Sequence, residues 1–124
     1  MVTVDDVRTL ALTLPRSYEA VVRDRLKFRV GRIVYLAFAK DETMMGFAFP
    51  KEERQALVES EPDKFLMPKA SDLRYNWVCV RLDTIDHDEL RELVIEAWRM
   101  CVPKKVRVAY DTRPSRRDVA DGQR

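Results

Sequence analysis

The chain holds few of the residues that enzymes use as nucleophiles, general bases or metal ligands. Its single histidine is His87, and its two cysteines, Cys79 and Cys101, lack the C-x-x-C spacing of a zinc site. A Cys79–His87 pair would need a strand and the start of a helix to converge, whereas thiols packed on apolar faces explain both cysteines more simply. Its three glycines lie far apart, which excludes a phosphate-binding loop and the G-x-G-x-x-G dinucleotide pattern. We therefore expect no catalytic activity, no metal and no cofactor.

A run of basic residues that alternate with apolar ones is the strongest binding signal. Residues 16–32 hold six basic and two acidic side chains, and Arg23, Arg25, Lys27 and Arg29 alternate with Asp24, Leu26 and Phe28. Successive side chains on a strand point to opposite faces, so these cations are expected on one face of a hairpin. Such a ribbon can lie along the phosphates of double-stranded DNA. The alternative is the solvated face of an ordinary sheet, protected by charge from edge pairing.

The C-terminal part of the chain adds further positive charge. Residues 101–124 hold seven basic and three acidic residues, whereas residues 1–100 hold 16 basic and 18 acidic ones. We expect a basic, mobile tail over residues 110–124. It could contact the phosphates of a nucleic acid, or it could be a solvated C-terminus without a partner. Because the rest is not net basic, any DNA binding is expected to be weak and salt-sensitive. The predicted phosphate contacts are Arg23, Arg25, Lys27, Arg29, Arg74, Lys104, Lys105 and Arg107.

Aromatic residues support an alternative, a module that binds a small molecule or a protein. Its site would be a cleft lined by Tyr35, Phe47, Tyr75 and Trp77, with Arg29 or Arg81 to fix an anionic ligand. Packing in the hydrophobic core would explain most of these aromatic residues equally well.

Secondary-structure signals predict an α+β fold, with an antiparallel sheet, formed by a meander and a later strand, and helices packed on one face. Thr3 is a candidate N-cap of the first helix, and Asp86 of the last. Pro62 and Pro68 predict an irregular segment over residues 61–76. Helices are expected over residues 4–13, 51–60 and 87–101, and strands over residues 18–23, 26–30, 33–39, 43–49 and 77–82.

Length and composition are those of a soluble, single-domain protein. The 124 residues are 46% hydrophobic and 35% charged, which suits one core. No apolar run approaches the roughly 20 residues of a membrane helix, and the N-terminus lacks the apolar core of a signal peptide. We expect no membrane partner, a cytoplasmic location, and a single domain over residues 1–109.

Several short motifs, in order and at similar spacing, resemble the MmcQ/YjbR family of small bacterial proteins. They are LALTLP at residues 10–15, F-R-V-G at residues 28–31, W-V-x-V-x-L-D at residues 77–83, and a following helix that carries Ala97-Trp98 and ends at Pro103-Lys104. The resemblance implies an α+β fold like the double-wing domain of a transcription factor, and with it a DNA-binding role. The chain departs from the family just before F-R-V, where a histidine and proline are common and residues 24–27 read D-R-L-K.

Overall fold

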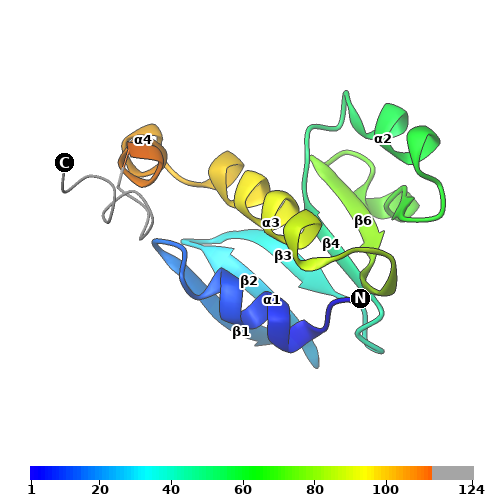
Figure 1. Ribbon diagram of the computed structural model, residues 1–124, viewed down its shortest axis with the longest axis horizontal. Coiled ribbons are helices and arrows are strands. Elements are labelled where there is room, and N and C mark those ends of the chain that lie inside the picture. The colour runs from blue at the N-terminus through cyan, green and yellow to red at the C-terminus, as the bar shows by residue number, and fades with distance from the viewer. Residues whose placement is uncertain (113–124) are drawn as a thin grey trace.

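The computed structural model describes residues 1–112. Six strands form one antiparallel sheet in the order β1-β2-β3-β4-β6-β5, and helices α1 and α3 pack on one face of it (Figure 1). The predicted α+β class is therefore confirmed. The helices are α1 (Val4–Ala11), α2 (Arg54–Ser60), α3 (His87–Cys101) and α4 (Lys104–Thr112); the strands are β1 (Ser17–Val22), β2 (Arg25–Val30), β3 (Ile33–Phe38), β4 (Met44–Ala48), β5 (Phe65–Leu66) and β6 (Trp77–Arg81).

Both predicted helix caps are present. The Thr3 hydroxyl accepts a hydrogen bond from the backbone of Asp6, and the Asp6 carboxylate accepts one from the backbone of Thr3, at 3.3 and 2.9 Å. These bonds to Thr3 hold the pKa of the Asp6 carboxyl below its usual range. Asp86 accepts from the backbone N–H of Glu89 at 2.8 Å, so α3 begins at His87 as predicted. These side chains satisfy N–H groups that the first turn of a helix leaves without partners.

The β1–β2 hairpin turns one residue earlier than the sequence suggested. Arg23 and Asp24 both have positive φ angles, 53° and 66°, as a two-residue hairpin turn with the twist of the strands requires. β2 then buries Leu26, Phe28 and Val30 and leaves the residues between them partly or fully exposed, as the alternation predicted.

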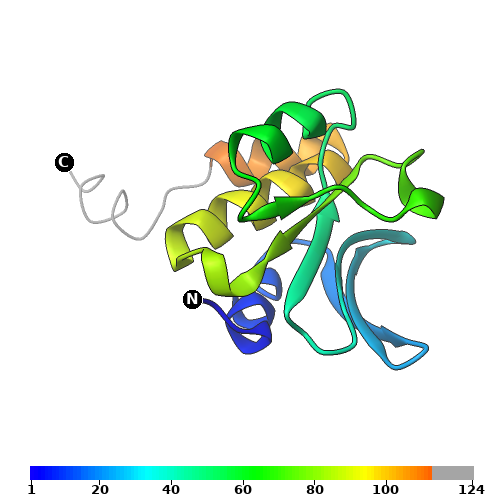
Figure 2. The same ribbon diagram turned by 90° about the vertical axis from the view of Figure 1, so that its right-hand side faces the viewer.

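The segment between β4 and β6 is more ordered than predicted. α2 begins at Arg54 rather than near residue 51, because residues 51–53 form turns. Within the segment expected to be irregular, Phe65–Leu66 pairs with β6 and adds the sheet's last strand. A single turn of 3-10 helix follows at Ala70–Asp72. This segment arches beside β6, as Figure 2 shows from the side.

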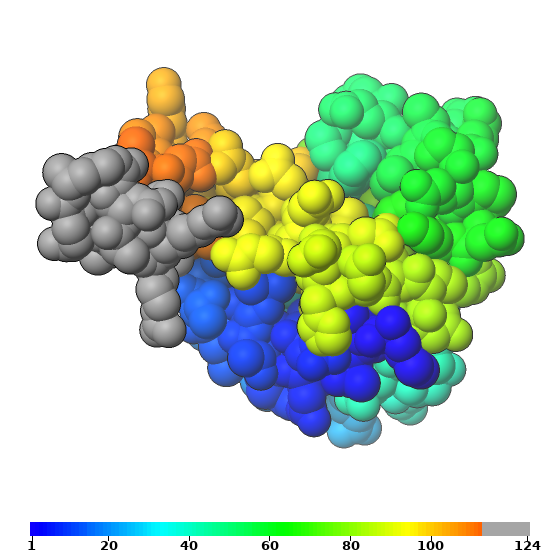
Figure 3. All heavy atoms as spheres, in the orientation of Figure 1, coloured from blue at the N-terminus to red at the C-terminus, as the bar shows by residue number. Residues whose placement is uncertain are grey.

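The core lies between the sheet and the pair α1 and α3, which lie side by side over it (Figure 3). Trp98 of α3 is fully buried, and its indole N–H donates to the carbonyl of Pro15 at 2.8 Å. A hydrogen bond of this kind satisfies the polar end of a buried indole. The bond ties α3 to the segment that joins α1 to β1.

Helix α4 crosses the predicted start of the tail at residue 110. Tyr110 is helical and packs edge-on against Trp98, with ring centroids 4.8 Å apart. Arg99 of α3 also pairs with Asp111. The packed part of the chain therefore extends to Asp111, and helix α4 ends at Thr112. The rest of the predicted tail, residues 113–124, lies outside the described residues.

Candidate functional site

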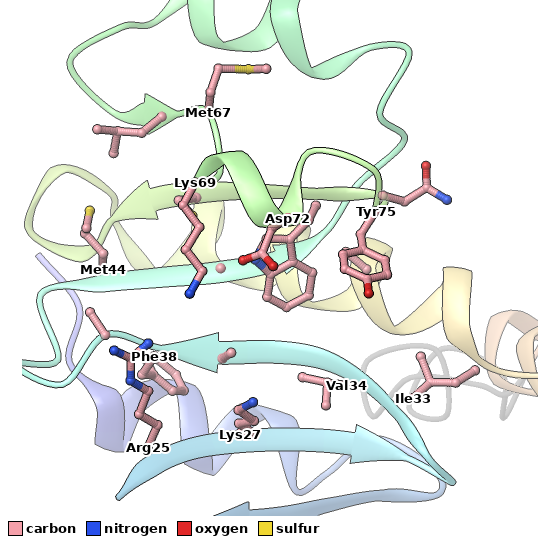
Figure 4. A pocket seen from close by; sticks show the side chains of 18 of the residues that line it. Arg25, Lys27, Ile33, Val34, Phe38, Met44, Met67, Lys69, Asp72 and Tyr75 are labelled. Carbon is pink, nitrogen blue, oxygen red and sulfur yellow. The ribbon is translucent and has the colours of Figure 1, made fainter. Parts of the chain in front are cut away.

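A cleft of about 900 Å³ opens on the side of the sheet that faces away from α1. One wall is formed by β2 and β3, and the other by the segment from Leu66 to Trp77. Figure 4 shows Arg25, Lys27 and Val34 on the first wall, with Lys69, Asp72 and Tyr75 opposite them. We call this space the cleft.

Small side chains make the floor of the cleft. Lys27 pairs with Ala37, Ala37 with Gly46, and Gly46 with Cys79, so one row of residues crosses four strands. All four of these residues line the cleft. Past Lys27, this row offers no side chain larger than a thiol, and at Gly46 the backbone is itself buried.

Gly46 is required by the indole of Trp77. A Cβ atom at Gly46 would lie 2.5 Å from Nε1 and 2.7 Å from two ring carbons of Trp77. The ring therefore lies directly on the glycine, and it reaches this position from the neighbouring strand, because Trp77 pairs with Ala48. A glycine in the interior of a strand is typical of such a close approach.

Three cations line the cleft: Arg25 and Lys27 from β2, and Lys69 from the opposite wall. Among the described residues, none of the three forms an ion pair. Asp72 is the one carboxylate that the described part of the chain contributes to the lining, and it is only partly exposed. The cleft therefore carries a net positive charge that side chains of the described chain do not neutralise.

A buried arginine fixes the wall that carries Tyr75 and Trp77. Arg54, at the first turn of α2, is 7% exposed and donates from Nη1 to the carbonyls of Tyr75 at 2.8 Å and Trp77 at 3.2 Å, and from Nη2 to that of Leu73. A guanidinium group presents several donors in a rigid plane, which suits the binding of several carbonyls at once. Sequence reasoning missed Arg54, because no motif marks a residue whose partners are backbone atoms about 20 residues away.

Two of the four aromatic residues that were predicted to line a cleft are in its lining. Tyr75 and Trp77 line the cleft. Tyr35 and Phe47, which were also predicted to line it, do not do so, because both are fully buried in the core. The Tyr35 hydroxyl shares a hydrogen bond of 2.6 Å with Ser17, and burial raises its pKa to about 12.

The arginines predicted to anchor a ligand, Arg29 and Arg81, are not in the lining. Arg81 donates instead to the carbonyl of Asp63 at 3.2 Å. The Nε atom of Arg29 is buried without a hydrogen-bond partner among the described residues. The cations in the cleft are instead Lys69 and two residues that the sequence had suggested as phosphate contacts, Arg25 and Lys27.

The other predicted phosphate contacts do not gather in one place. Arg23 is exposed in the β1–β2 turn, and Arg74 stacks on the ring of its neighbour Tyr75, 4.9 Å from the ring centroid. Lys104, Lys105 and Arg107 belong to α4, where Arg107 donates to the carbonyl of Arg99 at 3.1 Å. Figures 1 and 2 place α4 far from the β1–β2 turn. Within residues 1–112, hairpin and helix therefore form two separate basic regions.

The residues considered for catalysis do not come together. Cys79 and Cys101 are both free and both line the cleft, and burial raises the pKa of both thiols, that of Cys101 to about 11. His87 lies at the start of α3, with Nε2 3.5 Å from a carboxylate oxygen of Asp6. Over residues 1–112, no cluster of histidine, cysteine and acidic residues could hold a metal ion.

Comparison with known families decides the identity of the domain. The model of the YjbR family matches residues 12–100. The chain belongs to the YjbR family. A search of curated proteins found no match. Among solved structures, the crystal structure of Deinococcus radiodurans protein DR2400, which carries the domain DUF419, is similar at 25% identity with a TM-score of 0.71, over 83% of this chain and 80% of that one.

Neither comparison names an activity or a partner. The match to the YjbR family and the similarity to DR2400 each identify a domain only. No helix in the described part of this YjbR protein is both long and apolar enough to cross a membrane.

Proposed function

We propose that this YjbR protein is a non-catalytic binding module that takes a small anionic molecule into the cleft. The observation that carries the proposal is the convergence of Arg25, Lys27 and Lys69 from two opposite walls, without a carboxylate partner in residues 1–112. Like charges that face one another across a cleft repel, and an anion between them removes that repulsion. The volume of about 900 Å³ lies in the range of small-molecule sites.

The groups that line the cleft favour binding over catalysis. Over residues 1–112, the lining contains no histidine, serine or threonine. Its two thiols have raised pKa values because they are buried. A thiol that stays protonated near neutral pH is a weak nucleophile. The polar groups of the cleft are therefore suited to hold charge rather than to transfer protons or acyl groups.

A thermal-denaturation screen tests this proposal. The panel holds carboxylates, sulfonates and phosphates, each beside a neutral analogue of the same shape. A ligand that binds only the folded protein raises Tm by mass action. We expect some anions, and not their neutral analogues, to raise Tm. Lys27→Gln and Lys69→Gln should each weaken binding by about tenfold, since a hydrogen bond to a charged group contributes about 1.5 kcal/mol or more.

The matched control is Lys104→Gln, which removes an exposed lysine of α4 outside the cleft. Binding should be unchanged in this variant. The proposal fails if no anion raises Tm at millimolar concentration, or if the three variants bind alike.

Duplex DNA is the second candidate, favoured by the exposed β1–β2 turn. Arg23 lies in that turn, exposed and outside the cleft, and Arg25 follows it on β2. Such a turn can approach the phosphates of a duplex, with modest and salt-sensitive affinity. Arg74 and the α4 residues Lys104, Lys105 and Arg107 would be separate contacts.

Fluorescence anisotropy of a labelled random-sequence duplex at two salt concentrations distinguishes the candidates. A DNA-binding hairpin requires weaker binding in Arg23→Gln and at the higher salt concentration. Lys69→Gln, which changes the cleft and leaves the turn intact, should have little effect on DNA. Undetectable binding at low salt would exclude this candidate and leave the anion proposal intact.

A further inference from the structure

The cationic side chains of the cleft lie toward one end, beside Phe38 and Met44, whereas the side chains labelled at the opposite end are uncharged (Figure 4). Figure 4 shows Arg25 and Lys69 toward one end, and Ile33, Val34 and Tyr75 toward the other, with Lys27 and Asp72 between them. We call Arg25, Lys27 and Lys69 the basic end, and Ile33, Val34 and Tyr75 the apolar end. The strand register agrees with the picture, because Lys27 pairs with Ala37 while Val34 lies three residues earlier on β3.

From this division we propose that the ligand is an amphipathic anion, with one acidic head group at the basic end and an uncharged apolar body that lies toward the apolar end. The inference rests on the proposed function, because it assigns a ligand class to the same site. The shared chemistry is that of aryl and alkyl carboxylates and phosphates.

The length of the body follows from the strand. Ala37, the partner of Lys27, lies three residues after Val34 on β3. Because a strand rises about 3.3 Å per residue, the floor available to the body is roughly 10 Å long. Two fused aromatic rings or a short alkyl chain fill that length. The small side chain of Ala37 suits a planar body, which would lie beside the Trp77 indole that covers Gly46.

The charge of the body follows from what faces it. Asp72 projects from the wall opposite Lys27 (Figure 4), and a second negative group on the body would lie near this carboxylate and be repelled. A body with many polar edges would lose hydrogen bonds to water at the apolar end, since Ile33 and Val34 offer no side-chain donor or acceptor and the Tyr75 hydroxyl already accepts from Arg74 at 2.8 Å. A nucleic-acid strand, with charge at every nucleotide, fits this lining less well than a single acidic head.

Isothermal titration calorimetry with three probes tests the inference. Naphthoate carries the head and the body, naphthamide has the same rings without the charge, and acetate has the charge without the rings. We expect naphthoate to bind at least about tenfold more tightly than either of the others, because a charge-assisted hydrogen bond or a buried ring each contributes about 1.4 kcal/mol or more. Lys27→Gln should bring naphthoate close to naphthamide.

Two variants probe the space for the body, one in the floor beside Lys27 and one at the apolar end. Ala37→Leu fills the floor and should weaken naphthoate, and Val34→Asp places a negative charge at the apolar end and should do the same if the first variant fails to fold. Circular dichroism checks the fold of each variant. Lys104→Gln is the control and should bind naphthoate like the original protein.

Each contrary outcome has a separate meaning. If acetate binds as tightly as naphthoate, and Ala37→Leu and Val34→Asp fold and bind normally, the amphipathic ligand is excluded while the proposed anion site is retained. If naphthamide equals naphthoate and Lys27→Gln has no effect, both the inference and the proposed function fail. If none of the three probes binds at millimolar concentration, the inference is overturned, and the wider anion screen decides the proposed function on its own.

Discussion

Two adjacent rows of residues cross the same four strands and differ in almost every respect. One row, Phe28, Leu36, Phe47 and Val78, is fully buried beneath the helices. The next row, Lys27, Ala37, Gly46 and Cys79, forms the floor of the cleft. The first row fills its space with the chain's own side chains, as a close-packed core does. The second row leaves space unfilled and a charge unpaired, which is what a site for an outside molecule requires.

The comparison predicts a large loss of stability from the core row. Phe47 packs edge-on against Phe49 and Phe65, with ring centroids 6.1 and 6.4 Å away. Phe47→Ala should lower the free energy of unfolding by about 3–5 kcal/mol, because it removes buried area and leaves a cavity. Urea denaturation measures this loss. A loss below about 1 kcal/mol would contradict the assignment of this row to the core.

Arg54→Leu should give the next largest effect. The change leaves the carbonyls of Leu73, Tyr75 and Trp77 without their donor, and we expect a loss of about 2–3 kcal/mol. It should also weaken ligand binding, since the wall of the cleft that carries Tyr75 loses its support. The control is Gln55→Leu, which removes an exposed residue of α2 bonded only to Glu59. If both variants were equally stable, Arg54 would not support the wall of the cleft.

Gly46→Ala should cost about 1 kcal/mol, at the low end for overpacking, because Trp77 is only half-buried and can shift. Trp77→Phe shortens the ring that the new methyl group meets. A double-mutant cycle of the two changes should therefore show a coupling energy that partly offsets the loss. The cycle compares the free energies of unfolding of the original protein, the two single variants and the double variant by urea denaturation. If the losses of the single variants simply add in the double variant, contact with the indole is not the reason for a glycine at position 46.

Lys27→Gln should change the free energy of unfolding least. Lys27 forms no ion pair within the described chain and is partly exposed, so we expect a change within about 0.5 kcal/mol. The same variant is expected to bind the ligand more weakly. Lys27 should therefore contribute to ligand binding but not to the stability of the fold. A large loss of stability would assign Lys27 a structural role instead.

The elements that the sequence predicted well have strong local signals. Asp86 caps α3 and Pro103 follows it, so the bounds of this helix were correct. The alternation along β2 placed Lys27 and Phe28 on opposite faces, as the structure has them. These features depend on neighbours in the chain, which a single sequence displays directly.

The elements that it missed depend on distant contacts. Arg54 binds carbonyls of another segment, and Gly46 accommodates an indole from another strand. The sequence alone could not assign Tyr35 and Phe47 to the core or to the cleft, because an aromatic residue suits both. The register of the strands was needed to show which face of the sheet each side chain occupies. The basic hairpin was recognised, but only the position of Lys69 opposite Lys27 shows that its cations line a cleft (Figure 4).

The most direct test of the cleft as a ligand site is an NMR titration of the uniformly ¹⁵N-labelled protein with naphthoate. Backbone amide shifts report where the probe binds, independently of its affinity. We predict saturable shifts at Lys27, Ala37, Gly46, Lys69 and Cys79, and none at the α4 residues Lys104 and Lys105. Shifts confined to α4, or no saturable shift among the residues of the cleft, would contradict the assignment of the cleft as a ligand site.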